Sequence, residues 1–173
     1  MESGELLGDG FGRIRGLVER VLAPGLGPDA LWWRPDPDAN SIGWLLWHLT
    51  RVQDNHVSDI AGGEQIWTSD GHADRFVAFG VDPSPANTGY GHDTDQVGAM
   101  HPTAEALLAY HEATYDRTME YLGSLDADEL DRIIDTSYDP PVSVGVRLIS
   151  VLGDSWQHVG QAAYLRGMLE RLG

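Results

Sequence analysis

Hydrophobic residues recur at intervals of three and four positions along several long segments of the chain, which is the spacing of amphipathic α-helices. The first segment covers residues 5–22, where Leu7, Phe11 and Ile14 fall on one helical face. Pro24 stands just beyond it, and proline ends a helix because it lacks a backbone N–H and its ring collides with the preceding turn. The pattern predicts a first helix that buries this apolar face.

Three further long segments show the same helical spacing. The second helix is expected to begin after Asn40 or Ser41, whose side-chain oxygens suit an N-cap, and to end at Gly62. A short helix opened by Asp126 is expected to run to Ile134. The three predicted long helices cover residues 42–61, 103–122 and 142–172.

The stretch between Gly63 and Pro102 is rich in Gly, Asp, Pro and His, and we name residues 63–102 the crossover excursion. One short helix is expected at residues 72–79, with irregular backbone elsewhere. Loops of this length in a compact domain are usually functional or mobile. The fold class predicted for the chain is therefore all-α, a four-helix bundle with a long irregular crossover excursion between the second and third helices, in one domain spanning residues 1–173.

Candidate chemistry lies on the last helix, where Asp154 and His158 are four residues apart. Positions i and i+4 share a helical face, so one carboxylate and one imidazole point the same way. These groups supply two of the three protein ligands that catalytic divalent-metal sites commonly use. A third ligand is needed from another helix.

The second helix offers His48 and His56 as that third ligand. They are separated by about 12 Å along the helix axis, which excludes binding of one ion by both. His56 falls near the middle of the apolar stripe, whereas His48, like Asp154 and His158, falls on a flank. Periodicity alone leaves both candidates open. Among the remaining histidines, His111 is expected in the core, and the excursion histidines are expected at the surface: His72, His92 and His101.

Composition narrows the classes of partner and of chemistry. The chain has 27 acidic and 11 basic residues, a formal net charge of −16, which disfavours binding to nucleic acid or anionic membranes. It has no cysteine, which excludes thiolate metal ligands and a cysteine nucleophile. The absence of a long apolar run and of a secretory start favours a cytoplasmic protein without a membrane partner.

The segments SIGWLLWHLTRVQDNHV and DSWQHVGQAAYLRG resemble the DinB-like superfamily, which includes YfiT-like metal-dependent hydrolases and mycothiol-dependent maleylpyruvate isomerases. The similarity covers nearly the whole chain. It implies a divalent ion, zinc or nickel, bound by His48 of the WHLTRVQ motif together with Asp154 and His158. Many relatives carry His at the position of Asp154, and the isomerase branch carries Glu, so the shorter Asp departs from both patterns.

The resemblance implies a metal-dependent enzyme that acts on a small-molecule substrate, either a thiol S-transferase of the mycothiol type or a hydrolase. The alternative is a non-catalytic metal-binding or stress-response bundle, with a homodimer as its assembly. No catalytic residue is assigned by the motifs. Arg147 and Gln161 are expected to orient the ligands, Trp44 and Tyr90 to line a pocket, and residues 88–93 (TGYGHD) to cover it.

Overall fold

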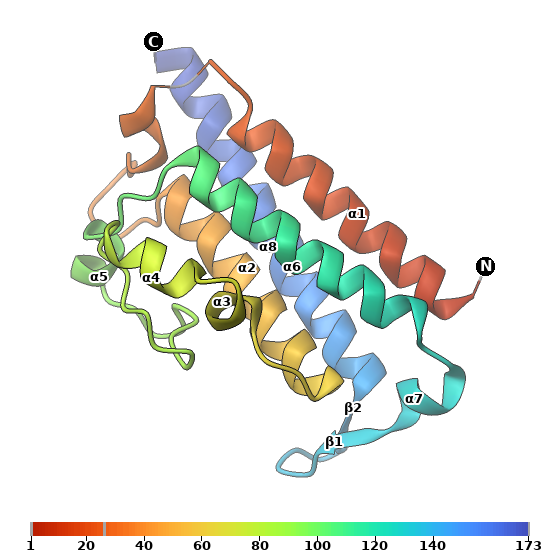
Figure 1. Cartoon of the computed structure of the whole chain (residues 1–173). Helices are drawn as coiled ribbons and strands as arrows, with labels where there is room; N and C mark the ends of the chain where they lie inside the picture. Colours follow the sequence, from red (N-terminus) through yellow and green to blue (C-terminus); the bar gives the residue numbers. More distant parts are fainter. Residues whose placement is uncertain (1, 26, 173) are drawn as a thin grey trace.

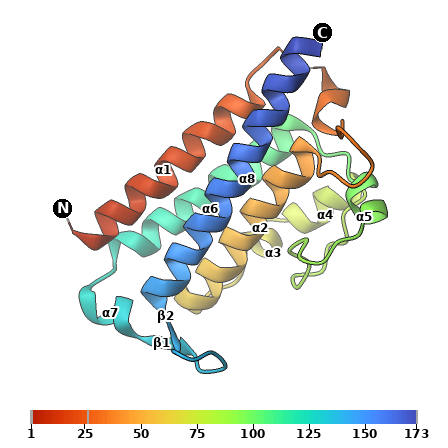
Figure 2. The same ribbon diagram turned by 180° about the vertical axis from the view of Figure 1, so that it is seen from behind.

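Four long helices run alongside one another and enclose most of the apolar side chains (Figure 1). The computed structural model of the chain describes residues 2–25 and 27–172. In the bundle, both α1 and α2 pack against α6 and α8, and Figure 2 shows α2 and α8 side by side. The predicted all-α bundle is confirmed. Its long helices are α1 (Ser3–Leu22), α2 (Ile42–Ala61), α6 (Ala104–Gly123) and α8 (Val144–Leu172).

The helix termini follow the predicted capping chemistry. The Ser41 hydroxyl accepts a hydrogen bond from the backbone N–H of Trp44 at 3.2 Å, and Gly62 ends α2 with a left-handed φ of 68°. Thr103 caps α6 in the same way, through the N–H of Ala106. Each cap satisfies backbone groups that a helix end leaves without an intrahelical partner.

The segment after α6 departs from the predicted helix at residues 126–134. The helix α7 (Ala127–Asp131) ends earlier, and β1 (Ile133–Asp135) pairs antiparallel with β2 (Val142–Ser143). The β-branched pair at 133 and 134 suits a strand better than a helix end. Consequently α8 begins at Val144, two residues later than expected.

The crossover excursion contains three short helices where one was predicted, and it packs along α2 and α6 (Figure 1). Helices of four to six residues are not stable alone, so tertiary contacts rather than local propensity decide where they form. They are α3 (Ile66–Ser69), α4 (His72–Val77) and α5 (Thr94–Gly98), and a 3-10 turn, η1 (Pro28–Leu31), precedes α2.

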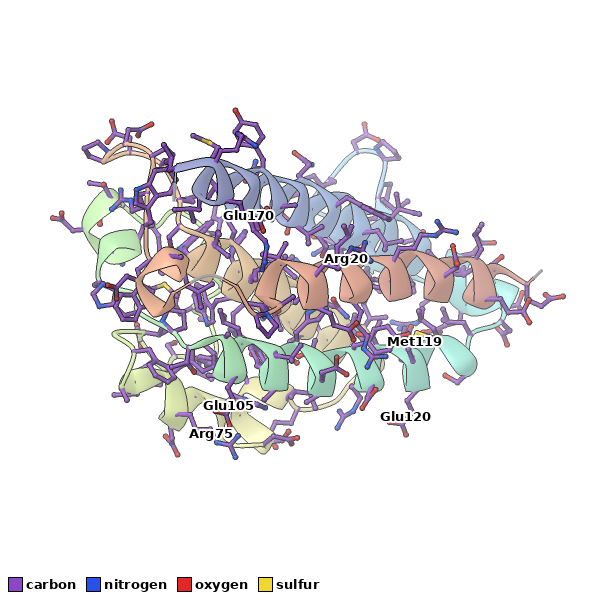
Figure 3. The ribbon with its side chains drawn as sticks, turned by 90° about the horizontal axis from the view of Figure 1, so that it is seen from above. Arg20, Arg75, Glu105, Met119, Glu120 and Glu170 are labelled. Atoms are coloured by element: carbon purple, nitrogen blue, oxygen red, sulfur yellow. The ribbon has the colours of Figure 1, made fainter. Side chains whose placement is uncertain are left out.

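Most charged side chains point away from the bundle, and most apolar side chains lie between its helices. Figure 3 shows Glu105, Glu120 and Arg75 pointing away from the helices, whereas Met119 lies between α6 and α1. None of the helices in the described residues is long and apolar enough to cross a lipid bilayer.

A buried ion pair joins α2 to the start of the excursion. Arg51 and Asp54 are 0% and 1% exposed, and Arg51 Nη1 lies 3.3 Å from Asp54 Oδ2. The Asp54 carboxylate also accepts hydrogen bonds from the backbone N–H groups of Ile66 at 2.9 Å and Trp67 at 2.8 Å. The Tyr110 hydroxyl donates a further bond to Asp54 at 2.7 Å. The carboxylate thereby fixes the first turn of α3 against α2.

The Arg51 guanidinium holds a later part of the excursion. It donates to the carbonyl oxygens of Pro85 at 2.7 Å and Asn87 at 3.0 Å, and to Gln65 Oε1 at 2.9 Å. Its Cζ also lies 4.8 Å from the centroid of the Trp67 ring, in cation–π geometry. A buried guanidinium is tolerated only when its donors are satisfied, so these partners fix residues 85–87 over α2.

Replacement of Asp54 tests this attachment, because it leaves a buried guanidinium without its counter-charge and two N–H groups without an acceptor. We expect Asp54→Ala to lower the free energy of unfolding by about 3–5 kcal/mol, measured by urea denaturation. Limited proteolysis should cut the excursion before the bundle. Asp59→Ala, at an exposed position of the same helix, should change the stability by no more than about 0.5 kcal/mol. Equal losses of stability in Asp54→Ala and Asp59→Ala would contradict the role of Asp54 in holding the excursion on α2.

His111 gives a second test, through the dependence of stability on pH. Its ring is 1% exposed, Nδ1 lies 3.1 Å from Thr50 Oγ1, and Nε2 has no partner among the described residues. Burial lowers the pKa of His111 to about 4. The unfolded chain therefore binds the proton first, and stability should fall by about 3 kcal/mol as pH drops from about 6.5 to about 4. Urea denaturation of His111→Gln across this pH range should show a smaller loss of stability, because the contribution of His111 is removed. A pH dependence equal to that of the wild type would refute the role of His111.

Candidate functional site

Three metal-ligating side chains meet where α2 and α8 pack together. His48 lies in the second turn of α2, and Asp154 and His158 lie one turn apart on α8. One nitrogen or oxygen atom from each residue lies within 4.8 Å of the others. Asp154 Oδ1 is 3.4 Å from Nε2 of His158 and 4.0 Å from Nε2 of His48. Ligand atoms bonded to one ion at about 2.1 Å lie no more than about 4.2 Å apart, and both distances are below that limit.

The surroundings of these groups suit a cation. His48 is 6% exposed, and the Asp154 and His158 side chains are 31% and 19% exposed. Asp154 Oδ2 is buried and has no hydrogen-bond partner among the described residues. A buried carboxylate oxygen without a partner is costly, and a bound metal ion would supply the missing interaction.

The orientation of His48 is fixed from the excursion. Its Nδ1 lies 2.5 Å from the carbonyl oxygen of Thr88, which can only accept, so Nδ1 carries the proton and the Nε2 lone pair faces Asp154. The Trp44 ring stacks on the imidazole with centroids 4.6 Å apart and planes 13° apart. Burial lowers the pKa of His48, which favours the neutral form that binds metals.

His158 is oriented in the same manner from its own helix. Nδ1 donates to Gln161 Oε1 at 3.2 Å, which directs Nε2 toward Asp154. The hydrogen bond that the protonated ring donates to Asp154 raises the pKa of His158, although burial acts in the opposite direction. Each imidazole therefore presents Nε2 to the same carboxylate and has its Nδ1 occupied by an oxygen, the arrangement that orients metal-bound histidines.

A small polar cluster secures the loop over His48. Asn87 Oδ1 accepts from the backbone N–H of Gly89 at 3.2 Å and lies 2.9 Å from His92 Nε2. His92 Nδ1 in turn accepts from Trp44 Nε1 at 3.2 Å. Asn87 and the Thr88 carbonyl were not identified from the sequence. The only signal for them was the glycine-rich stretch at 88–93, which was expected to cover the site.

A cavity of about 520 Å³ opens beside the ligands. Its walls come from α2, from the excursion and from Asp154 on α8. It is large enough for a small organic molecule, and two of the three candidate ligands, His48 and Asp154, line it. The lining residues are His48, Val52, Asn55, His56, Ala86, Thr88, Tyr90 and Asp154.

Of the four residues expected around the candidate ligands, two contact the ligands and two make no hydrogen bond to them among the residues that the structure describes. Gln161 and Trp44 contact His158 and His48 as described above. Tyr90 is 93% exposed at the cavity wall. Arg147 makes no hydrogen bond to the three ligands in the described residues, because its guanidinium bonds His56 Nδ1 at 3.1 Å and Asp135 at 3.3 Å.

The structure distinguishes the two histidines of α2 where periodicity did not. His48 is buried, whereas His56, which the helical stripe favoured as the inward residue, is only half-buried. Helix α2 packs against α8, α6 and α3, so most of its circumference is covered. The centre of a single apolar stripe is therefore a poor guide to burial on this helix.

The predicted burial of the remaining histidines is confirmed for two of them and wrong for two. His111 is buried in the core and His101 is exposed, as expected. The surface prediction is wrong for His72, which is 4% exposed and packs its ring 4.8 Å from that of Tyr110. It is also wrong for His92, which is half-buried against Trp44. Both lie on the side of the excursion that faces the bundle, which local sequence does not reveal.

Comparisons with known proteins show which family and which solved structure the chain resembles. The model of the DinB superfamily matches residues 13–162, a range that includes all three candidate ligands. The crystal structure of a conserved protein from Enterococcus faecalis is similar, with a TM-score of 0.87 and 26% sequence identity over 96% of each chain. No curated protein matches the chain.

The close contact between the loop and His48 can be tested at Gly89. Its φ is +88°, and a Cβ there would lie 2.8 Å from Trp47 Cζ3 and 3.0 Å from His48 Nδ1. Gly91 shares a positive φ of +78° but faces open space. Both Ala variants should suffer backbone strain of about 1–2 kcal/mol, and Gly89→Ala should lose about 1–3 kcal/mol more through overpacking. Equal unfolding free energies for the two variants in urea would show that the loop is not closely packed on His48.

Proposed function

Because the chain belongs to the DinB superfamily, we propose that it is a divalent-metal-dependent enzyme acting on a small molecule, with His48, Asp154 and His158 as its metal ligands. The reaction is either the transfer of a low-molecular-weight thiol, such as mycothiol, to the small molecule or the hydrolysis of that molecule. The observation that carries the proposal is the convergence of three ligand atoms within 4.8 Å beside a cavity of about 520 Å³.

The donor set fits a divalent ion of the zinc or nickel class. Two imidazole nitrogens and one carboxylate oxygen are ligands that both metals accept. Two observations support the assignment: Asp154 Oδ2 is buried without a hydrogen-bond partner in the described part of the chain, and both Nε2 atoms lie near Oδ1. The shorter Asp is thus compatible with the site, since its Oδ1 lies close to both imidazoles.

An open cavity beside the ligands favours a catalytic site over a structural one, because structural metal sites are usually closed by a fourth protein ligand. A divalent ion in such a site lowers the pKa of a coordinated water or thiol into the neutral range. The chain has no cysteine of its own, so any thiol in the reaction comes from the solution.

The protein's own side chains orient and shield the reacting groups. Thr88 and Gln161 hold the two imidazoles in the tautomer that leaves Nε2 available. Trp44 covers the face of His48 and keeps water from that side of the ligands. These contacts keep the geometry fixed before a substrate enters, which lowers the cost of reorganisation during the reaction.

Metal content tests the ligand set directly. Purified wild-type protein, loaded with zinc or nickel and desalted, should retain about one ion per chain, whereas His48→Ala, His158→Ala and Asp154→Ala should lose most of it in elemental analysis. Asp154→Glu should keep metal, because the carboxylate is retained. His101→Ala, at an exposed histidine outside the candidate ligand set, should keep it as well. Equal metal content in wild type and His158→Ala would rule out the site.

A further inference from the structure

The cavity beside the candidate ligands continues along α2 for two helical turns. His48, Val52, Asn55 and His56 line it at positions i, i+4, i+7 and i+8, which share one face of the helix. His56 lies about 12 Å from His48 along the axis. The cavity therefore has two polar ends, one at the metal ligands and one at Asn55 and His56.

The protonation of His56 at the far end is set by Arg147. A guanidinium can only donate, so the 3.1 Å contact from Arg147 Nη1 makes His56 Nδ1 an acceptor and places the proton of the neutral ring on Nε2. Burial, and then the charge of Arg147, lower the pKa of His56 and favour that neutral ring. Asp135 accepts from the other guanidinium nitrogen at 3.3 Å and holds Arg147 in place.

Two hydrogen-bond donors are thus left available at this end of the cavity. Among the described residues, neither His56 Nε2 nor the Asn55 side-chain amide has a hydrogen-bond partner, and both residues line the hollow. Donors that converge on a cavity recognise an oxygen acceptor of the bound molecule. The positive charge of Arg147 behind the imidazole favours an anionic acceptor over a neutral one.

We propose that Asn55 and His56 form a carboxylate-binding subsite, so that the substrate carries a metal-binding atom at one end and a carboxylate at the other. The inference rests on the proposed metal site and adds the class of substrate to it. The charges at the two ends are complementary to such a substrate. One carboxylate ligand leaves a divalent ion with a net charge of about +1, which suits a thiolate. At the other end, the His56 imidazole in contact with Arg147 suits the substrate carboxylate.

Binding of simple thiols to the cobalt-loaded protein tests the subsite without an assay of activity. A thiol coordinated to cobalt produces a thiolate-to-metal charge-transfer band, which gives its dissociation constant by titration. Mercaptohexanoic acid and mercaptohexanol differ only in the terminal group. We expect the acid to bind about tenfold or more tightly, with a preference that changes along a series from mercaptopropionic to mercaptooctanoic acid as the carboxylate comes within reach of the subsite.

Variants test whether Asn55 and His56 cause the preference for the acid over the alcohol. His56→Leu and Asn55→Ala should each weaken binding of the acid more than binding of the alcohol, and so reduce the preference for the acid toward unity. His56→Gln should retain it, since the amide can accept from Arg147 and still donate into the cavity. His101→Gln is the matched control at an exposed histidine, and circular dichroism checks the fold of each variant.

The outcomes separate this inference from the proposed function. Equal affinities of acid and alcohol for wild-type protein, with the charge-transfer band present, would overturn the subsite and leave the metal site standing. A preference that survives in both His56→Leu and Asn55→Ala would overturn it too. A protein that binds no cobalt would refute the metal site, and with it the substrate class inferred here.

Discussion

The buried ion pair between Arg51 and Asp54 is the interaction on which the geometry of the candidate site depends. Two charges removed from water must be satisfied almost completely by hydrogen bonds, or they destabilise the fold. Tyr110 of α6 supplies one partner, and most of the others come from the crossover excursion: backbone N–H groups at the start of α3, and the carbonyl oxygens of Pro85 and Asn87. The requirement to satisfy the pair therefore anchors a segment that is otherwise short helices and loops.

One further residue, Thr88, connects this anchored segment to the candidate metal ligand His48. Thr88 follows directly after Asn87, and its carbonyl oxygen fixes the tautomer of His48. Gly89 then allows the backbone to pass against His48 and Trp47, where a side chain would collide. The buried polar pair, the loop and the imidazole form one connected arrangement, in which the element that shapes the cavity also orients a ligand.

The two ends of the cavity illustrate how the environment assigns different roles to similar residues. His48 and His56 lie two turns apart on one helix and both line the same hollow. The Nδ1 of His48 faces a carbonyl oxygen, which directs a lone pair at the candidate metal position. The Nδ1 of His56 accepts from a guanidinium, which leaves the proton of the neutral ring on Nε2. One histidine is thus suited to bind a cation and the other to bind an anion.

The sequence by itself determined the four long helices, their caps at Ser41 and Gly62, and the pairing of Asp154 with His158, because helical periodicity and capping are local properties. The choice of His48 came from family resemblance, since periodicity left both His48 and His56 open as the third ligand. Only the tertiary structure decided which α2 histidine is buried beside α8, where the excursion forms its short helices, and that Arg147 contacts His56 instead of the ligands. These features depend on contacts between residues far apart in the chain, such as Thr88 with His48, and local sequence carries no record of such contacts.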